Sequence, residues 1–326
     1  MQWQEIISAV FFAASFALGV VAVKIVSARH LKKGIIGIDV NKPGLKKIPE
    51  STGIALLLPV WVCTIAFYWL YGDLTVFLWA GMVSCFSILG FFDDIKPKFL
   101  SETRKWSYRA IIIAIISLAF AAFFFSGENL AGSLFKIILA SLFLAGIASF
   151  QNTFAGLNGW EVGSGFILSV FFAALLFVSP YSGLVPLALA VSGAVFALLV
   201  FNVFPARAFP GDSGTLLIGS ALAGLLVWTK DFRIMSISFL FFLPHIIDFT
   251  AKLFTNPSDP SQRNALPYSL SPEQKIALPP RGKGSGKYDF AKILIRLFGP
   301  MSERNLVLVI WAILIANCLT VFLLLA

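Results

Sequence analysis

Long apolar runs, separated by short polar stretches, follow one another along the whole of this chain. Each run holds roughly 18–22 mainly apolar residues, which is long enough for a helix to cross a hydrocarbon core of about 30 Å. The pattern therefore predicts an all-α, polytopic membrane protein with ten transmembrane helices. The expected spans are approximately residues 5–27, 52–71, 74–92, 108–126, 132–150, 162–179, 182–201, 213–229, 233–251 and 305–325.

Composition excludes a water-soluble globular protein. Of the 326 residues, 58% are hydrophobic and only 13% are charged, which is about half the charged share of a soluble domain. The first apolar run lacks a basic segment before it, so we expect a retained spanning helix and not a cleaved signal peptide. The three cysteines all fall inside apolar runs and are expected to be buried hydrophobes, not disulfides or metal ligands.

Basic residues are distributed very unevenly between the two sets of loops. All but three of the 25 lysines and arginines lie in or beside the loops that follow odd-numbered spans, the exceptions being Lys136, Lys230 and Arg233. Loops rich in lysine and arginine stay on the cytoplasmic side of a membrane, so we expect both termini outside. Residues 1–326 then form a single membrane-embedded domain, with cytoplasmic loops at about 28–51, 93–107, 151–161, 202–212 and 252–304.

Most acidic residues lie on the same, cytoplasmic side as the basic residues. Lysine and arginine alone would be enough to orient the helices in the membrane, so the acids need another explanation. Acids and bases mixed with Asn, Gly and Pro predict a polar site there, and the net charge of +9 does not indicate nucleic-acid binding in this context. A nucleotide-sugar transporter is the main alternative, but transporters place polar groups near the middle of the bilayer. A membrane scaffold is a third class, and it would not need polar groups at the mouths of four spans.

Two adjacent carboxylates, Asp93 and Asp94, stand at the cytoplasmic end of the third span. Such a pair is costly at a membrane boundary unless a cation lies near it. Mg²⁺ suits the position because it binds carboxylates and substrate phosphates together. The alternative is a solvated helix end, with the acids paired to Lys96 or Lys98.

Two further blocks carry candidate ligands. Residues 151–163 hold two Asn, three Gly and one Glu between apolar spans; Asn oxygens ligate hard metals, and Gly lets backbone approach a ligand closely. An ordinary polar turn is the alternative. Asp212 is either the N-cap of the eighth span or part of a metal site with Asn152 and Asp93 or Asp94. Together these groups fit phosphoryl transfer, in which charge neutralisation and positioning dominate.

Several polar blocks match one known family: residues 39–42 with 48–50, the 93–94 pair, 152–161, 202–212, and 297–300 with 303–306. Through them the chain resembles the polyprenyl-phosphate N-acetylhexosamine-1-phosphate transferases of glycosyltransferase family 4. The blocks AGLNGWEVG and GP…ERNL are similar to the eukaryotic and archaeal branch, the UDP-GlcNAc–dolichyl-phosphate GlcNAc-1-phosphotransferases. The resemblance spans nearly the whole chain, and the family's ten-helix topology agrees with the ten predicted spans.

The resemblance implies transfer of GlcNAc 1-phosphate from UDP-GlcNAc to a polyprenyl, dolichyl-type phosphate, giving polyprenyl-diphospho-GlcNAc and UMP. This is the first step of lipid-linked glycan assembly. Mg²⁺ is the implied cofactor, with Mn²⁺ as a substitute, and membrane lipid is a further partner. Homodimers occur in the family, so the resemblance allows one here. The short chain and the branch motifs favour an archaeal plasma membrane over the endoplasmic reticulum.

The resemblance also implies roles for single residues. Asn152 and Asp212 correspond to Mg²⁺ ligands. Asp93 and Asp94 correspond to an essential catalytic pair, of which either could be the base. Lys105 corresponds to the cation on the diphosphate, with Arg104 as the alternative. The implied substrate-binding residues are Asn158 and Phe209 at the uracil, together with Asp39, Lys42, Glu50, Glu161 and Arg263.

One departure concerns the last cytoplasmic loop, where family members often carry an Arg/His cluster. Arg263 fits its first position, but Asn264 and Ala265 follow. The residues that bind the sugar and diphosphate are therefore expected to differ from those of other family members. This leaves another UDP-N-acetylhexosamine as an alternative donor for the same reaction.

Overall fold

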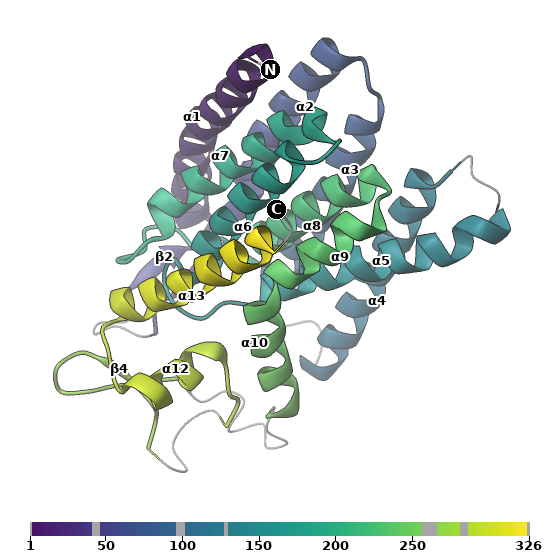
Figure 1. The fold of residues 1–326 in the computed structure, drawn as a ribbon. Coiled ribbons are helices and arrows are strands. Elements are labelled where there is room, and N and C mark those ends of the chain that lie inside the picture. The colour runs from purple at the N-terminus through teal and green to yellow at the C-terminus, as the bar shows by residue number, and fades with distance from the viewer. Residues whose placement is uncertain are drawn as a thin grey trace.

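The computed structural model describes residues 2–40, 46–95, 102–126, 130–255, 266–280 and 286–324, with the side chains of 2, 102–107 and 130–132 left aside (Figure 1). The fold is a bundle of helices, as the apolar runs predict. Its α-helices are α1 (Gln2–Lys33), α2 (Leu57–Tyr71), α3 (Thr75–Ile95), α4 (Glu102–Phe124), α5 (Leu130–Thr153), α6 (Trp160–Phe177), α7 (Val185–Asn202), α8 (Gly211–Thr229), α9 (Phe232–Phe241), α10 (Leu243–Phe254), α12 (Phe290–Phe298) and α13 (Glu303–Leu323).

Within the described residues, eight helices are long and apolar enough to cross a membrane, or nine if the bent pair α9–α10 is one span. The protein is therefore a multi-pass membrane protein. The expected span at 108–126 corresponds to part of α4, whose described apolar stretch, Tyr108–Phe124, is shorter than the others. The count of ten and the position of both termini outside stay predictions.

Helices α7 and α8 form the buried centre, and most of their residues are shielded from the surface. Small residues in α8 let its neighbours approach closely, which is how membrane helices gain packing energy. A Cβ atom at Gly219 would press on the backbone of Ala148 in α5, and one at Gly90 in α3 would overlap the backbone of Asp212. Close packing thus brings the ends of α3, α5 and α8 together.

The expected ninth span breaks into α9 and α10, which meet at 67°. Pro244 explains the break, because proline has no N–H for the carbonyl four residues earlier and its ring displaces the preceding turn. Asn317 of α13 compensates by donating from Nδ2 to the carbonyl oxygens of Leu240, at 3.0 Å, and Phe241, at 3.1 Å. Side chains of neighbouring helices commonly satisfy such freed groups in membranes.

Two short antiparallel sheets were not predicted: β1 (Ile36–Ile38) pairs with β2 (Lys47–Pro49), and β3 (Ser269–Leu270) with β4 (Ile276–Ala277). Each has only two or three residues per strand, too few for a visible alternating pattern. The second sheet packs with α12 and the start of α13 in a satellite core. Helix α12 buries Phe290, Leu294 and Ile295 against the protein itself.

Several helices extend a few residues into the approximate loops expected at 93–107, 151–161 and 202–212. Helix α3 runs on through Asp93 and Asp94, α5 through Asn152, and α6 and α8 include Glu161 and Asp212 in their first turns. Polar side chains at a helix end interrupt the apolar pattern without ending the helix. These five candidate residues therefore stand at helix ends, which hold them more firmly than loops would.

Candidate active site

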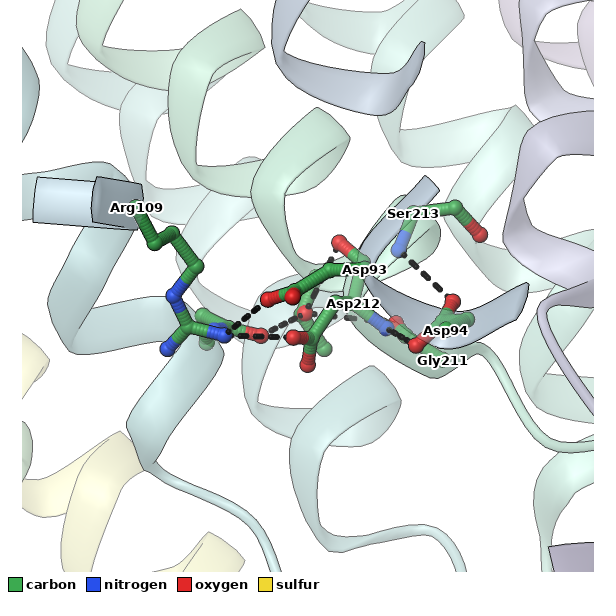
Figure 2. Close-up of polar contacts among 8 residues, drawn as sticks. Asp93, Asp94, Arg109, Gly211, Asp212 and Ser213 are labelled. Carbon is green, nitrogen blue, oxygen red and sulfur yellow. Dashed lines mark hydrogen bonds and ion pairs between the residues drawn. The ribbon is translucent and has the colours of Figure 1, made fainter. Parts of the chain in front are cut away.

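One arginine joins carboxylates from two helices where α3, α4 and α8 meet (Figure 2). Arg109 Nη1 donates to Asp93 Oδ2 at 3.0 Å and to Asp212 Oδ2 at 2.5 Å. The three side chains are 16%, 25% and 31% exposed, respectively. Two carboxylates this close repel each other, and the guanidinium between them offsets that repulsion.

Asn152, in the last turn of α5, completes this group, hereafter the acidic cluster (Asp93, Arg109, Asn152 and Asp212). The amide satisfies its neighbours when Nδ2 donates to Asp212 Oδ1 at 2.9 Å and to Thr215 Oγ1 at 2.5 Å. Its Oδ1 then accepts from Arg109 Nη2 at 3.1 Å. Oxygens from three helices therefore converge on one cation.

Asp94 faces away from this cation, toward the start of α8. Its Oδ1 accepts from the backbone N–H of Asp212 at 3.0 Å, and its Oδ2 from that of Ser213 at 3.3 Å (Figure 2). A carboxylate at a helix N-terminus satisfies free N–H groups and complements the helix dipole. The N-cap function considered for Asp212 is thus performed by Asp94, from another helix.

Two neighbouring cavities open at this end of the bundle. The acidic cavity, of about 200 Å³, is lined by Glu50, Asp94, Asn152, Ala155, Glu161, Phe209, Gly211, Asp212 and Thr215. The loop cavity, of about 320 Å³, is lined by Ile38, Asp39, Val40, Ala155, Gly156, Leu157, Asn158, Glu161 and Phe209. Because Ala155, Glu161 and Phe209 border both, one elongated ligand could occupy the two cavities together.

The loop cavity depends on residues 154–159, the α5–α6 loop. Asn158 Nδ2 donates to the buried Asp39 at 3.0 Å, and its backbone N–H donates to Glu303 at 2.8 Å. The backbone N–H of Gly159 donates to Asn202 Oδ1 at 3.0 Å. Gly159 has a φ of 87°, in the left-handed region that favours glycine. The loop is therefore fixed by side chains from distant parts of the chain.

Phe209 stands between the cavities, and its backbone is held on both sides. Its N–H donates to the carbonyl of Pro49 at 2.9 Å, while its own carbonyl accepts from the N–H and hydroxyl of Thr52 at 3.0 and 2.7 Å. Glu50 follows Pro49 and lines the acidic cavity. Burial, and secondly the negative charge of Asp212, raise the pKa of the Glu50 carboxyl.

The acidic cluster fits a magnesium ion. In the part of the chain that is described, no three His, Cys, Asp or Glu side chains are grouped to hold a metal. Mg²⁺ does not need such a group, because it commonly takes one or two carboxylates and completes its shell with water and phosphate oxygens. Asp93, Asp212 and Asn152 supply hard oxygen donors that already face a cation.

The structure brings together most of the residues expected from the sequence. Asp94, Asn152 and Asp212 meet at the acidic cavity with Glu50, and Asp93 lies beside it on Arg109. Asp39, Asn158, Glu161 and Phe209 line the loop cavity. Lys42, Arg263 and the side chain of Lys105 lie outside the described residues. The individual roles expected for these residues stay predictions.

Sequence reasoning missed Arg109, which was treated only as one of many basic loop residues. Its signal was present: it is the last charged residue before the long apolar run of α4. It also missed the residues that hold the α5–α6 loop, Asn202, Glu303 and Lys252, since their partners lie far away in sequence.

Comparisons with known proteins agree with these motifs. The glycosyl transferase family 4 model matches residues 76–230. A Methanocaldococcus jannaschii protein named as a glycosyltransferase is 31% identical over 288 residues, covering 85% of this chain and 83% of its own. The phospho-N-acetylmuramoyl-pentapeptide-transferase of Chlamydia abortus is 30% identical over 259 residues, covering 67% and 73%. The UDP-N-acetylglucosamine–dolichyl-phosphate N-acetylglucosaminephosphotransferase of Dictyostelium discoideum is 27% identical over 369 aligned positions, covering 94% and 85%.

The region matched by the family model runs from α3 to α8. It contains every member of the acidic cluster and the whole α5–α6 loop. Similarity to the Methanocaldococcus protein extends over most of both chains. The chain therefore belongs to glycosyl transferase family 4, as a membrane-embedded phosphoglycosyltransferase.

Proposed function

We propose that this protein transfers GlcNAc 1-phosphate from UDP-GlcNAc to a polyprenyl phosphate, releasing UMP. In this reaction an oxygen of the lipid phosphate forms a bond to the β-phosphorus of the donor, and the bond from that phosphorus to the UMP oxygen breaks. The observation that carries the proposal is the pair of adjoining cavities, one lined by acidic residues and the other bordered by Asn158 and Phe209. The printed names of the relatives support the same reaction class.

The uridine end of the donor is placed in the loop cavity. The ring of Phe209 offers a face on which a base can stack. Because Nδ2 of Asn158 is engaged by Asp39, its Oδ1 is the atom left to accept a hydrogen bond, which the N3–H of uracil can donate. Cytosine lacks that N–H, so the arrangement favours uracil.

The diphosphate is placed in the acidic cavity, where its charge needs cations. Arg109 can supply one when it turns from the carboxylates toward the phosphate, since a guanidinium binds phosphate oxygens in pairs. Bound Mg²⁺ would neutralise charge on the transferred phosphoryl group, held by Asn152, Asp212 and Asp93. Asp94 borders this cavity, but both of its oxygens accept from the start of α8. Asp93 contacts Arg109 instead, so we assign Asp93 as the member of the pair that acts on the metal and phosphate.

The lipid substrate explains why this chemistry sits at the end of a membrane bundle. A polyprenyl chain remains in the bilayer while its phosphate reaches the surface. We propose a cell membrane, with the two cavities on the cytoplasmic side, because most of the basic residues lie in loops on that side. A homodimer stays a prediction.

UMP release tests the proposal directly. Detergent-purified protein is given UDP-GlcNAc, a short polyprenyl phosphate and Mg²⁺, and rival reactions contain UDP-GalNAc, UDP-glucose or UDP-MurNAc-pentapeptide. We expect UMP only when lipid and metal are both present, with UDP-GlcNAc preferred. UMP formation that needs no lipid phosphate would contradict the proposed transfer.

Another donor for the same reaction is the second candidate, because the Chlamydia relative is named for a muramoyl-pentapeptide substrate. Preference for UDP-MurNAc-pentapeptide in the rival reactions would select it. Binding of UDP-sugar without any UMP release would instead favour the transporter, which the relatives' names do not support.

A further inference from the structure

A lysine outside the acidic cluster holds the base of the α5–α6 loop. Lys252, in the last turn of α10, donates from Nζ to the carbonyl oxygens of Thr153, at 2.5 Å, and Ala155, at 3.3 Å. Its Nζ also lies 5.6 Å from the centre of the Trp160 ring. One ammonium group therefore touches the end of α5, the loop after it and the first residue of α6.

Asp248, one turn earlier in α10, fixes this lysine. Its side chain is fully buried, and Oδ2 lies 2.7 Å from Lys252 Nζ. Its Oδ1 accepts from the backbone N–H of Phe290, at the start of α12, at 2.8 Å. The pair thus ties the α5–α6 loop to α10 and to the start of α12.

The ammonium of Lys252 is already occupied by the protein. Of its three N–H donors, two serve the carbonyls of Thr153 and Ala155, and the Asp248 carboxylate forms an ion pair with it at 2.7 Å. The charge of Asp248 also neutralises its own. We therefore assign Lys252 a geometric contribution and not a contact with the substrate phosphates.

The loop that this lysine holds separates the two ends of the site. Asn152, in the acidic cluster, lies one residue before Thr153, and Asn158 lies in the loop cavity. We propose that the Lys252–Asp248 pair is a positioning device, which sets the loop so that a nucleoside diphosphate reaches both cavities at once. This inference rests on the proposed function, because it concerns the binding of the donor.

Steady-state kinetics of a paired substitution tests the proposal. Lys252→Met alone would leave a buried, unpaired carboxylate, so the double variant Lys252→Met/Asp248→Asn removes both charges together. We expect its KM for the UDP-sugar to rise about 10- to 100-fold, because small misplacements of binding groups have effects of that size. The KM for the polyprenyl phosphate should not change. The single variant Lys252→Arg can still form hydrogen bonds to the same carbonyls, so it should keep most of the affinity for the UDP-sugar.

Lys275→Met is the matched control, since Lys275 pairs with exposed Glu273 at the surface and its loss should leave both KM values unchanged. An unchanged donor KM in the double variant overturns the inference. Equal rises in both KM values with a lower melting temperature also overturn it, because they indicate general loss of structure. A failure of the proposed function would look different, because the wild type itself would then release no UMP from any donor. In that case, UDP binding measured by calorimetry still compares the double variant with the wild type and tests the positioning of the loop.

Discussion

The acidic cavity and the loop cavity share a wall but are built in different ways. In the acidic cavity, Asp94, Asn152 and Asp212 all project from the ends of long membrane helices. In the loop cavity, Asn158 comes from a six-residue connection whose backbone is held by Asn202 and Glu303, from other elements. The first cavity takes its shape from helix packing, and the second from individual hydrogen bonds.

This difference suits the two tasks that we propose for them. Charge neutralisation in phosphoryl transfer needs donors fixed in place before the substrate arrives. Recognition of a base needs a few directed hydrogen bonds and an aromatic surface. Substitutions in the first cavity should therefore reduce turnover, whereas substitutions in the second should weaken donor binding.

The largest effect is expected for Asp212→Asn. The change preserves shape but removes a negative charge that faces both Arg109 and the proposed metal ion. We expect kcat for UMP release to fall by about 10²–10³-fold or more, as when a charge-stabilising group is lost from other active sites. Initial rates at saturating Mg²⁺ and both substrates measure this, with gel filtration as the check on folding. A rate near that of the wild type would contradict the assignment of the acidic cluster.

Arg109→Met should have the next largest effect. Loss of the guanidinium removes a cation from the phosphate site and leaves Asp93 and Asp212 in mutual repulsion, so we expect kcat to fall by about 10²-fold. The melting temperature of the variant should rise more with added Mg²⁺ than that of the wild type, because the ion then supplies the missing charge.

Arg207→Met is the control for Arg109→Met. Arg207 is exposed and donates to the carbonyl of Val200 at 2.7 Å, outside the acidic cluster. Its replacement should change neither kcat nor the response to Mg²⁺. If both variants behave alike, the effect at Arg109 comes from the general loss of positive charge.

In the loop cavity, Asn158→Ala should raise the KM for the UDP-sugar while lowering kcat much less. Loss of a hydrogen bond to an uncharged group typically costs about 1 kcal/mol, and leaving Asp39 with one partner fewer adds to it, so we expect about a tenfold rise in KM. Competition by UMP and CMP sharpens the test: the preference of the wild type for UMP should decrease in the variant. A fall in kcat at constant KM would place Asn158 with the acidic cluster instead.

Asp94→Asn distinguishes the role of Asp94 from that of the neighbouring Asp93. Because Asp94 caps α8, its replacement should lower stability by about 0.5–2 kcal/mol, the usual value of a helix cap, with a smaller loss of kcat than Asp93→Asn. Thermal unfolding and UMP release, measured on both variants, check this. A larger kcat loss for Asp94→Asn would reverse the roles that we assign to the pair.

The acidic cavity could largely be predicted from the sequence, and the loop cavity less well. Asp93, Asn152 and Asp212 each stand at the end of an apolar run on the same predicted side, so the pattern alone brings them together. The role of Arg109 could not be predicted, because its partners depend on how α4 is rotated about its own axis. Contacts between residues 145 apart, as for Asn158 and Glu303, leave no local pattern to read.

The smallest expected effect concerns Glu50, which borders the acidic cavity. Burial and the charge of Asp212 raise its pKa in the folded protein above that in the unfolded chain. The folded state then holds a proton that the unfolded chain releases, so the contribution of Glu50 to stability is lost as pH rises through the folded pKa. Glu50→Gln does not titrate, and it should gain stability relative to the wild type as pH rises from about 4, the ordinary pKa of a Glu, through the raised pKa of Glu50. Thermal unfolding of both proteins without metal measures this, and a difference that stays constant with pH would show that Glu50 titrates normally and is not coupled to the acidic cluster.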